Sequence, residues 1–217
     1  MLQQFLLNHF VGGEFSGKMK VVLFVLALVG SSLGLIFDRE CPGHSAVENF
    51  NTEQYQGVWY EVYRYETSEQ YGSDCATFEY YATGADTMDL VFRWVYIENN
   101  FDELYRYGNA VREAGAAGSA RFQVTFDDEP GRNINYQVLA TDYDSFSLIW
   151  SCHNLGNGQS NEDAWVLSKI PHPDMDEFEQ VVGGAIDAYL DRAHLRGTVQ
   201  GWENCTDIPA RAYFGLK

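Results

Sequence analysis

The 217-residue sequence has little positive charge, few prolines and few cysteines. It contains 14 Lys and Arg against 31 Asp and Glu, a formal net charge of −17, with 5 Pro and 4 Cys. This acidity argues against nucleic acid as a partner, because the phosphate backbone is bound by clustered basic side chains. The simplest explanation of the charge is solubility in an extracellular fluid.

The chain also lacks the short motifs of common enzyme classes. It contains no Gly-x-Ser-x-Gly, no His-Glu-x-x-His, no phosphate-binding glycine loop and no dinucleotide fingerprint. Its histidines are scattered, without the spacing of a metal-binding pair. We therefore expect no enzymatic activity, no required cofactor and no metal site.

No apolar run is long enough to span a bilayer, which takes roughly 20 residues. Residues 21–29 form a short apolar run behind Lys20, and the small residues Ser32 and Gly34 follow it. This order is typical of a secretory signal peptide, although a buried apolar helix is an alternative. We predict that residues 1–34 are an N-terminal extension and signal peptide, with translation starting at Met1 or Met19. Residues 35–217 would then form one secreted domain without an integral membrane anchor.

Secretion would place the four cysteines in an oxidising compartment, where an even number favours disulfides. The spacings from Cys41 to Cys75, Cys152 and Cys205 are 34, 77 and 53 residues in turn, which match no zinc or redox motif. Three pairings are open from these numbers alone. The tripeptide from Asn204 to Thr206 also fits the N-glycosylation sequon.

Between residues 57 and 169, short runs rich in aromatic and β-branched residues are separated by turns of Gly, Asn and Asp. This pattern is typical of a β-barrel or sandwich. The predicted strands lie near residues 57–65, 75–82, 87–96, 103–112, 119–127, 133–141, 145–152 and 163–169. Eight strands close into a barrel with room for one small ligand. After Pro173 the apolar spacing changes to 3.6 and predicts one amphipathic helix over residues 175–190, capped by Asp174.

Alternation within the strands predicts the side chains that face the interior, because successive residues of a strand point to opposite faces. The clearest case is residues 88–95, in which every second side chain is large and apolar. The predicted inward residues are Ala76, Phe78, Tyr80, Met88, Leu90, Phe92, Trp94, Phe122, Val124, Phe126, Ile134, Tyr136 and Val138.

Three segments, in this order, resemble the lipocalin family. Gly57-Val58-Trp59 opens the first predicted strand after a short helical turn, and Thr141-Asp142-Tyr143 lies at a later turn. The last predicted strand ends with Trp165 to Lys169, with lysine where the family usually has arginine. Within the family, the stretches around Trp59 and Tyr71 are most similar to arthropod bilin-binding proteins, insecticyanins and apolipoprotein D-like members.

The resemblance implies an all-β, eight-stranded antiparallel up-and-down barrel with one C-terminal helix packed outside. It implies disulfides between Cys41 and Cys152 and between Cys75 and Cys205. It further implies closure of one barrel end by Gly57, Trp59, Thr141, Asp142 and Lys169. Lysine can lie on the face of tryptophan but lacks the planar fork of arginine, so we expect a weaker closure.

The function implied by the resemblance is extracellular binding and transport of a small hydrophobic ligand inside the barrel. Biliverdin or another pigment is the leading candidate, and a colourless lipid, retinoid, fatty acid or pheromone is the alternative. Biliverdin would be a bound ligand, not a required cofactor. We expect a monomer or weak homo-oligomer. Two further alternatives are a lipocalin-type enzyme such as a lipid-mediator isomerase, which needs a free thiol or other nucleophile, and a protein that acts through its surface around a filled barrel.

The candidate ligand-binding residues come from the inward faces, with the phase of the last two strands set by the family pattern. They are Phe78, Tyr80, Leu90, Phe92, Trp94, Arg106, Phe122, Val124, Tyr136, Val138, Ile149 and Trp165. Arg106 shares a face with Leu104, and both Arg106 and Arg64 are candidates for a ligand carboxylate. The predicted lid is the loop over residues 66–74. For each aromatic residue the alternative role is simple filling of the core.

Overall fold

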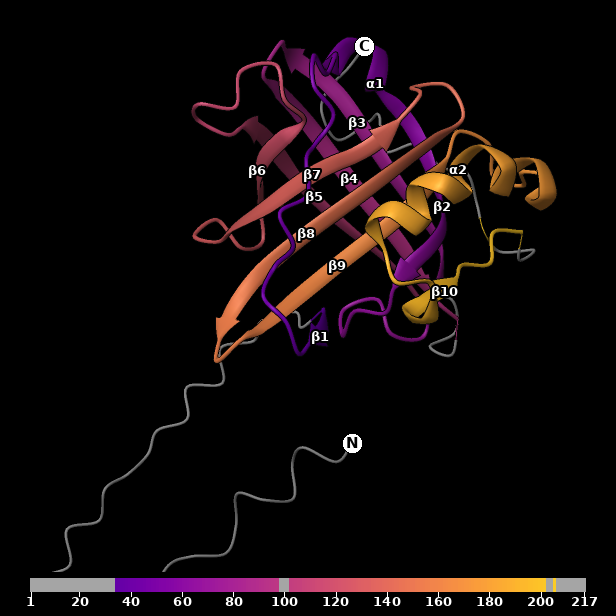
Figure 1. Ribbon diagram of the computed structural model, residues 1–217. Coiled ribbons are helices and arrows are strands. Elements are labelled where there is room, and N and C mark those ends of the chain that lie inside the picture. Colours follow the sequence, from indigo (N-terminus) through magenta and orange to yellow (C-terminus); the bar gives the residue numbers. More distant parts are fainter. Residues whose placement is uncertain (1–33, 98–101, 202–204, 206–217) are drawn as a thin grey trace, which may run out of the picture. The chain divides into compact units, whose positions relative to one another are not determined.

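The computed structural model describes residues 34–97, 102–201 and 205 (Figure 1). The signal peptide predicted for residues 1–34, apart from Gly34, and the sequon at Asn204 lie outside these residues. Within the described residues, no helix has the length and apolar character needed to cross a membrane.

Eight antiparallel strands form a closed barrel, as predicted. They are β2 (Gly57–Tyr65), β3 (Ser73–Gly84), β4 (Thr87–Tyr96), β5 (Asp102–Arg112), β6 (Arg121–Phe126), β7 (Asn133–Thr141), β8 (Phe146–Gly156) and β9 (Gln159–Ser168). Each strand pairs with the next along the chain, and pairing of β9 with β2 closes the barrel. The strands β8 and β9 are longer than predicted, because a tight turn at Asn157 and Gly158, both with positive φ, joins them.

The side chains predicted to face inward form one apolar cluster inside the barrel. Met88, Leu90 and Trp94 of β4 are at most 3% exposed, and the alternate residues of β3, β6 and β7 join them. Ile149 of β8 also belongs to this interior cluster, and Trp165 of β9 packs against it while remaining partly exposed. The inward-facing positions taken from the family pattern are therefore the ones observed on both strands.

The predicted helix, α2 (Met175–Tyr189), packs on the outer surface of the barrel (Figure 1). The Asp174 side chain caps it by accepting hydrogen bonds from the backbone N–H groups of Asp176 and Glu177. Phe178 and Ile186 are buried in a second apolar cluster, which contains outward-facing residues of β8 and β9. This cluster covers the barrel from outside and leaves the interior to the first cluster.

Four short elements complete the described fold around the barrel: β1 (Leu35–Phe37), α1 (Thr52–Tyr55), the 3₁₀ helix η2 (Arg192–His194) and β10 (Leu195–Gly197). β1 pairs with β9, and β10 pairs with the second half of β2. Beyond β10, the backbone N–H of Thr198 donates to Val62 and that of Cys75 donates to Val199. The C-terminal segment is therefore bonded to both β2 and β3, an arrangement that the sequence analysis did not predict.

Both disulfides implied by the resemblance are present. Cys41 is linked to Cys152, and Cys75 is linked to Cys205, so no cysteine is free. One link fixes the segment before the barrel to β8, and the other fixes the C-terminal segment to β3. The thiol-dependent version of the isomerase alternative would need a free cysteine, whereas all four cysteines are in disulfides.

Candidate ligand-binding site

The barrel end beside α1, called the base below, is closed around Trp59. This side chain is fully buried, and its Nε1–H donates a 2.9 Å hydrogen bond to the carbonyl of Tyr55. The Lys169 Nζ atom lies 3.9 Å from the centre of the Trp59 ring and donates a 2.9 Å hydrogen bond to the carbonyl of Gln56. Burial lowers the pKa of Lys169 to about 8. Gly57 has φ of +106°, which side-chain-bearing residues rarely adopt.

The segment Thr141-Asp142-Tyr143 forms the turn that completes the base. One carboxylate oxygen of Asp142 accepts hydrogen bonds from the backbone N–H groups of residues 144, 145 and 146. Burial alone would raise the pKa of Asp142, but these hydrogen bonds outweigh it and the pKa is lowered. The Tyr143 hydroxyl accepts a hydrogen bond from the N–H of Asn51, the residue that caps α1. The turn at Thr141-Asp142-Tyr143 is thus joined to the start of α1, which leads into the Gly57-Val58-Trp59 segment.

Three buried tyrosines fill the base half of the interior. The Tyr55 hydroxyl lies 2.7 Å from the Ser147 hydroxyl, and the hydroxyls of Tyr80 and Tyr136 are hydrogen-bonded to each other. The second bond joins β3 to β7. Burial raises the pKa of each tyrosine, so all three remain neutral at physiological pH. These side chains therefore occupy the base half of the interior, and the opposite end of the barrel is called the mouth below.

Large apolar side chains line the mouth half. We call Phe78, Phe92, Trp94, Tyr96, Leu104, Phe126, Ile134 and Trp165 the mouth-side cluster. The Phe78 ring lies 4.3 Å from Phe92 and 5.9 Å from Trp165 between centres. Leu104, Ile134 and Trp165 face inward but remain partly exposed, whereas the tyrosines of the base half are fully enclosed. The accessible inward-facing apolar surface therefore lies in the mouth half.

The predicted lid loop contacts this cluster, though not through Tyr71, which is 76% exposed. The Trp165 Nε1–H donates a 2.9 Å hydrogen bond to Oε1 of Gln70, and the Tyr96 hydroxyl donates to the carbonyl of Glu69 at 2.6 Å. The Gln70 amide in turn donates to the buried carboxylate of Glu61. Glu69 and Gln70 thus join the loop to the mouth-side cluster.

Arg106 faces the interior, as alternation predicted, but its side chain is already paired. The guanidinium donates hydrogen bonds of 2.9–3.3 Å to the carboxylates of Glu69, Asp128 and Glu129. It also lies 3.9 Å from the centre of the Phe126 ring and is 4% exposed.

Arg64 is fully buried in a different network. It donates to the carboxylates of Glu61 and Glu66 and to two backbone carbonyls of the lid region. Its prediction as a ligand contact receives no support from this geometry, because the guanidinium braces β2 against the lid loop and the C-terminal segment.

Asp163 is an inward-facing residue that the sequence analysis did not name. It lies two residues before Trp165 on β9 and so shares its inward face, which alternation could have revealed. Burial raises its pKa to about 7, although Arg132 acts in the opposite direction. Alternation could not have revealed Glu69, Asp128 and Glu129, because these residues lie on loops, where side chains do not alternate regularly between two faces.

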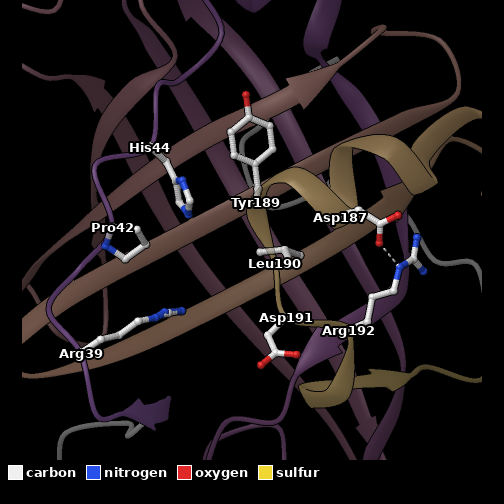
Figure 2. A pocket seen from close by; sticks show the side chains of 8 residues that line it. All are labelled: Arg39, Pro42, His44, Asp187, Tyr189, Leu190, Asp191 and Arg192. Atoms are coloured by element: carbon white, nitrogen blue, oxygen red, sulfur yellow. Dashed lines mark hydrogen bonds and ion pairs between the residues drawn. The ribbon is translucent and has the colours of Figure 1, made fainter.

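A separate hollow lies outside the barrel, between the end of α2 and the segment after β1 (Figure 2). The His44 ring lies 5.3 Å from Tyr189 there, and the Asp187–Arg192 ion pair forms another part of the wall. Five of its eight lining residues carry ionisable acidic or basic side chains or histidine, and Leu190 is the single large aliphatic residue among them. This hollow fits a hydrophobic ligand less well than the mouth-side cluster does.

A family model described as "Lipocalin-like domain" matches residues 50–200. The chain belongs to the lipocalin family. The match spans the barrel from α1 to the C-terminal segment, so it includes the base, the lid loop and the mouth-side cluster of this lipocalin.

Relatives among known proteins agree with this assignment. The lipocalin is 26% identical over 187 residues to Lazarillo protein of Schistocerca americana, covering 85% of this chain and 86% of that protein. It is 28% identical over 152 residues to Bilin-binding protein of Pieris brassicae, covering 68% and 77%. Among solved structures, insecticyanin of the tobacco hornworm Manduca sexta matches with a TM-score of 0.66 at 17% identity, covering 80% and 93%. At that identity the structural match supports the fold alone.

Proposed function

We propose that this lipocalin is a secreted carrier that binds one small hydrophobic ligand within the mouth-side cluster. The proposal rests on a difference between the two halves of the barrel interior. The base half is filled by hydrogen-bonded tyrosines, whereas Leu104, Ile134 and Trp165 present partly exposed apolar surface toward the mouth. Apolar walls with a few polar groups are typical of sites for small lipophilic molecules. The two disulfides support an extracellular location.

Two ligand classes follow from different observations. The printed name of the Pieris brassicae relative, Bilin-binding protein, supports biliverdin, which was also the leading candidate from the sequence. A colourless neutral lipid or retinoid is the second candidate, and the complete pairing of Arg106 favours it, because a ligand carboxylate finds no free guanidinium there. The twelve candidate ligand-binding residues remain proposals, with Phe92, Trp94 and Trp165 the strongest among them.

Equilibrium titration with biliverdin and with retinol tests the proposal. Binding is measured by the absorbance of biliverdin and by the fluorescence of retinol, and we expect saturation at one ligand per chain for at least one probe. Leu104→Trp places a larger side chain in the mouth-side cluster and should weaken binding at least tenfold. The matched control is Val111→Trp on the same strand, since Val111 is 47% exposed on the outer face. Equal binding by both variants would refute the mouth-side site, and no binding of either probe by the wild type would refute the carrier function.

The same preparation tests the predicted assembly state. We propose a monomer or weak homo-oligomer, and sedimentation velocity at several concentrations should give a species near 24.6 kDa, reduced by the mass of the cleaved signal peptide.

A further inference from the structure

The mouth end of the barrel carries an excess of negative charge directed at one arginine. The Arg106 guanidinium bonds to three carboxylates, those of Glu69, Asp128 and Glu129. Arg132 bonds to Glu129 at 3.3 Å, and Asp163 adds a further carboxyl group on the inward face of β9. Acidic groups thus outnumber the two guanidiniums here, even though Asp163, with a pKa of about 7, is only partly ionised near neutral pH. Burial and the neighbouring Glu129 and Asp128 raise the pKa of Glu69 against the opposing effect of Arg106.

Every nitrogen of the Arg106 guanidinium is already engaged by a carboxylate. Its Nε, Nη1 and Nη2 atoms all donate to carboxylate oxygens within 3.3 Å. The pattern extends beyond Arg106, since every arginine within the described ranges forms at least one ion pair with Asp or Glu. Lys169, the described lysine, is at the base on Trp59. A ligand carboxylate would therefore have to displace Glu69 or Asp128 from Arg106, and its approach would be repelled by those carboxylates.

A neutral donor is available in the same half of the barrel. The Nε1–H group of Trp94 is buried and has no hydrogen-bond partner in the described part of the chain. The side chain is 3% exposed and belongs to the interior cluster. Trp94 pairs with Leu104 across β4 and β5, and the next inward pair toward the base is Phe92 with Arg106. A buried donor without a partner is uncommon, and a ligand oxygen would satisfy it.

From these observations, and resting on the proposed carrier function, we infer that the barrel selects ligands whose buried polar end is an uncharged hydrogen-bond acceptor, such as a hydroxyl, ketone or ester. The Trp94 indole donates to that acceptor. The Arg106 cluster holds the lid loop through Glu69 and disfavours an ionised carboxylate. Arg106 thus affects ligand selectivity indirectly, through Glu69 of the lid loop and the other carboxylates bonded to the guanidinium. The sequence analysis had instead named Arg106 as a candidate for direct contact with a ligand carboxylate.

The test compares ligands that differ chiefly in charge. Retinol is compared with retinoic acid, and biliverdin dimethyl ester with biliverdin, each by equilibrium titration at pH 7.5. We expect the uncharged member of each pair that binds to have a dissociation constant at least tenfold lower. Glu69→Gln removes one carboxylate but keeps the shape, and it should reduce this preference severalfold. An acid that binds as tightly as its neutral counterpart would overturn the inference while leaving the carrier function intact, whereas failure of all four probes to bind would overturn both.

Trp94→Phe tests the donor separately. It retains an aromatic ring but removes the N–H group, and it should weaken retinol binding about fivefold, as expected for loss of one hydrogen bond. Trp150→Phe is the matched control, because Trp150 donates its Nε1–H to Glu162 in the second apolar cluster, outside the interior. Near-ultraviolet circular dichroism establishes that each variant is folded. Equal retinol affinity for Trp94→Phe and the wild type would exclude Trp94 as the donor and contradict the inference.

Discussion

Replacement of Arg64 should destabilise the protein far more than replacement of an exposed arginine. The Arg64 side chain is fully buried and donates to Glu61 at 2.8 Å, to Glu66 at 2.9 Å and to the carbonyls of Gln70 and Ser73 at 2.8 and 3.0 Å. Arg64→Met leaves the buried Glu61 carboxylate without its cation and removes one donor from each of two buried carbonyls. Removal of one partner of a buried ion pair costs about 3–5 kcal/mol. We expect the free energy of unfolding to fall by that amount.

The assay is equilibrium unfolding in urea, followed by tryptophan fluorescence. The control is Arg121→Met, because Arg121 pairs with Glu113 at 3.0 Å but the two side chains are 48% and 39% exposed. Exposed pairs contribute about 0–1 kcal/mol, so this variant should unfold almost as the wild type does. A double variant, Glu61→Gln with Arg64→Met, should recover part of the loss because the buried carboxylate is then neutral. Equal losses for Arg64→Met and Arg121→Met would refute the role of this network.

Three further predictions concern the base and the C-terminal segment. Gly57→Ala should lower the free energy of unfolding by about 1–3 kcal/mol, because φ is +106° there, whereas Gly131→Ala, at an open site without positive φ, should have little effect in the same urea assay. Replacing Cys75 and Cys205 together by serine should cost about 2–5 kcal/mol, measured by thermal unfolding beside the oxidised wild type. The pKa of Lys169 is lowered to about 8 from 10.5, so between these values the unfolded chain binds more protons and stability rises with pH. Lys169→Met should lack this rise between pH 7.5 and 9.5, and identical pH dependence of the two proteins would exclude the effect.

The sequence predicted the barrel well because most of its strands have one apolar face. In β4, the spacing of Met88, Leu90, Phe92 and Trp94 determines both the strand and its inward side, since a shift of one residue would expose all four. The base was predictable for a different reason. Trp59 contacts Tyr55 and Lys169, which lie in or next to the short family motifs recognised in the sequence.

The mouth could not be predicted in the same way. Glu69 is 37 residues from Arg106 along the chain, and Asp128 is 22 residues away, on loops whose sequences have no periodicity. Alternation placed Arg106 inward but carried no information about the carboxylates that meet it. Similarly, β10 is three residues long, and its position depends on contacts such as the 2.8 Å ion pair between Arg196 and Asp74. These features depend on tertiary packing, which local patterns do not encode.

The most direct test of the account is a crystal structure of the protein with retinol. We predict ligand density inside the barrel, in contact with Phe92, Trp94 and Leu104 and above the Tyr80–Tyr136 hydrogen bond. Density confined to the outer hollow beside His44 (Figure 2), with the mouth-side cluster unoccupied, would contradict the central claim that the mouth half of the barrel is the ligand site.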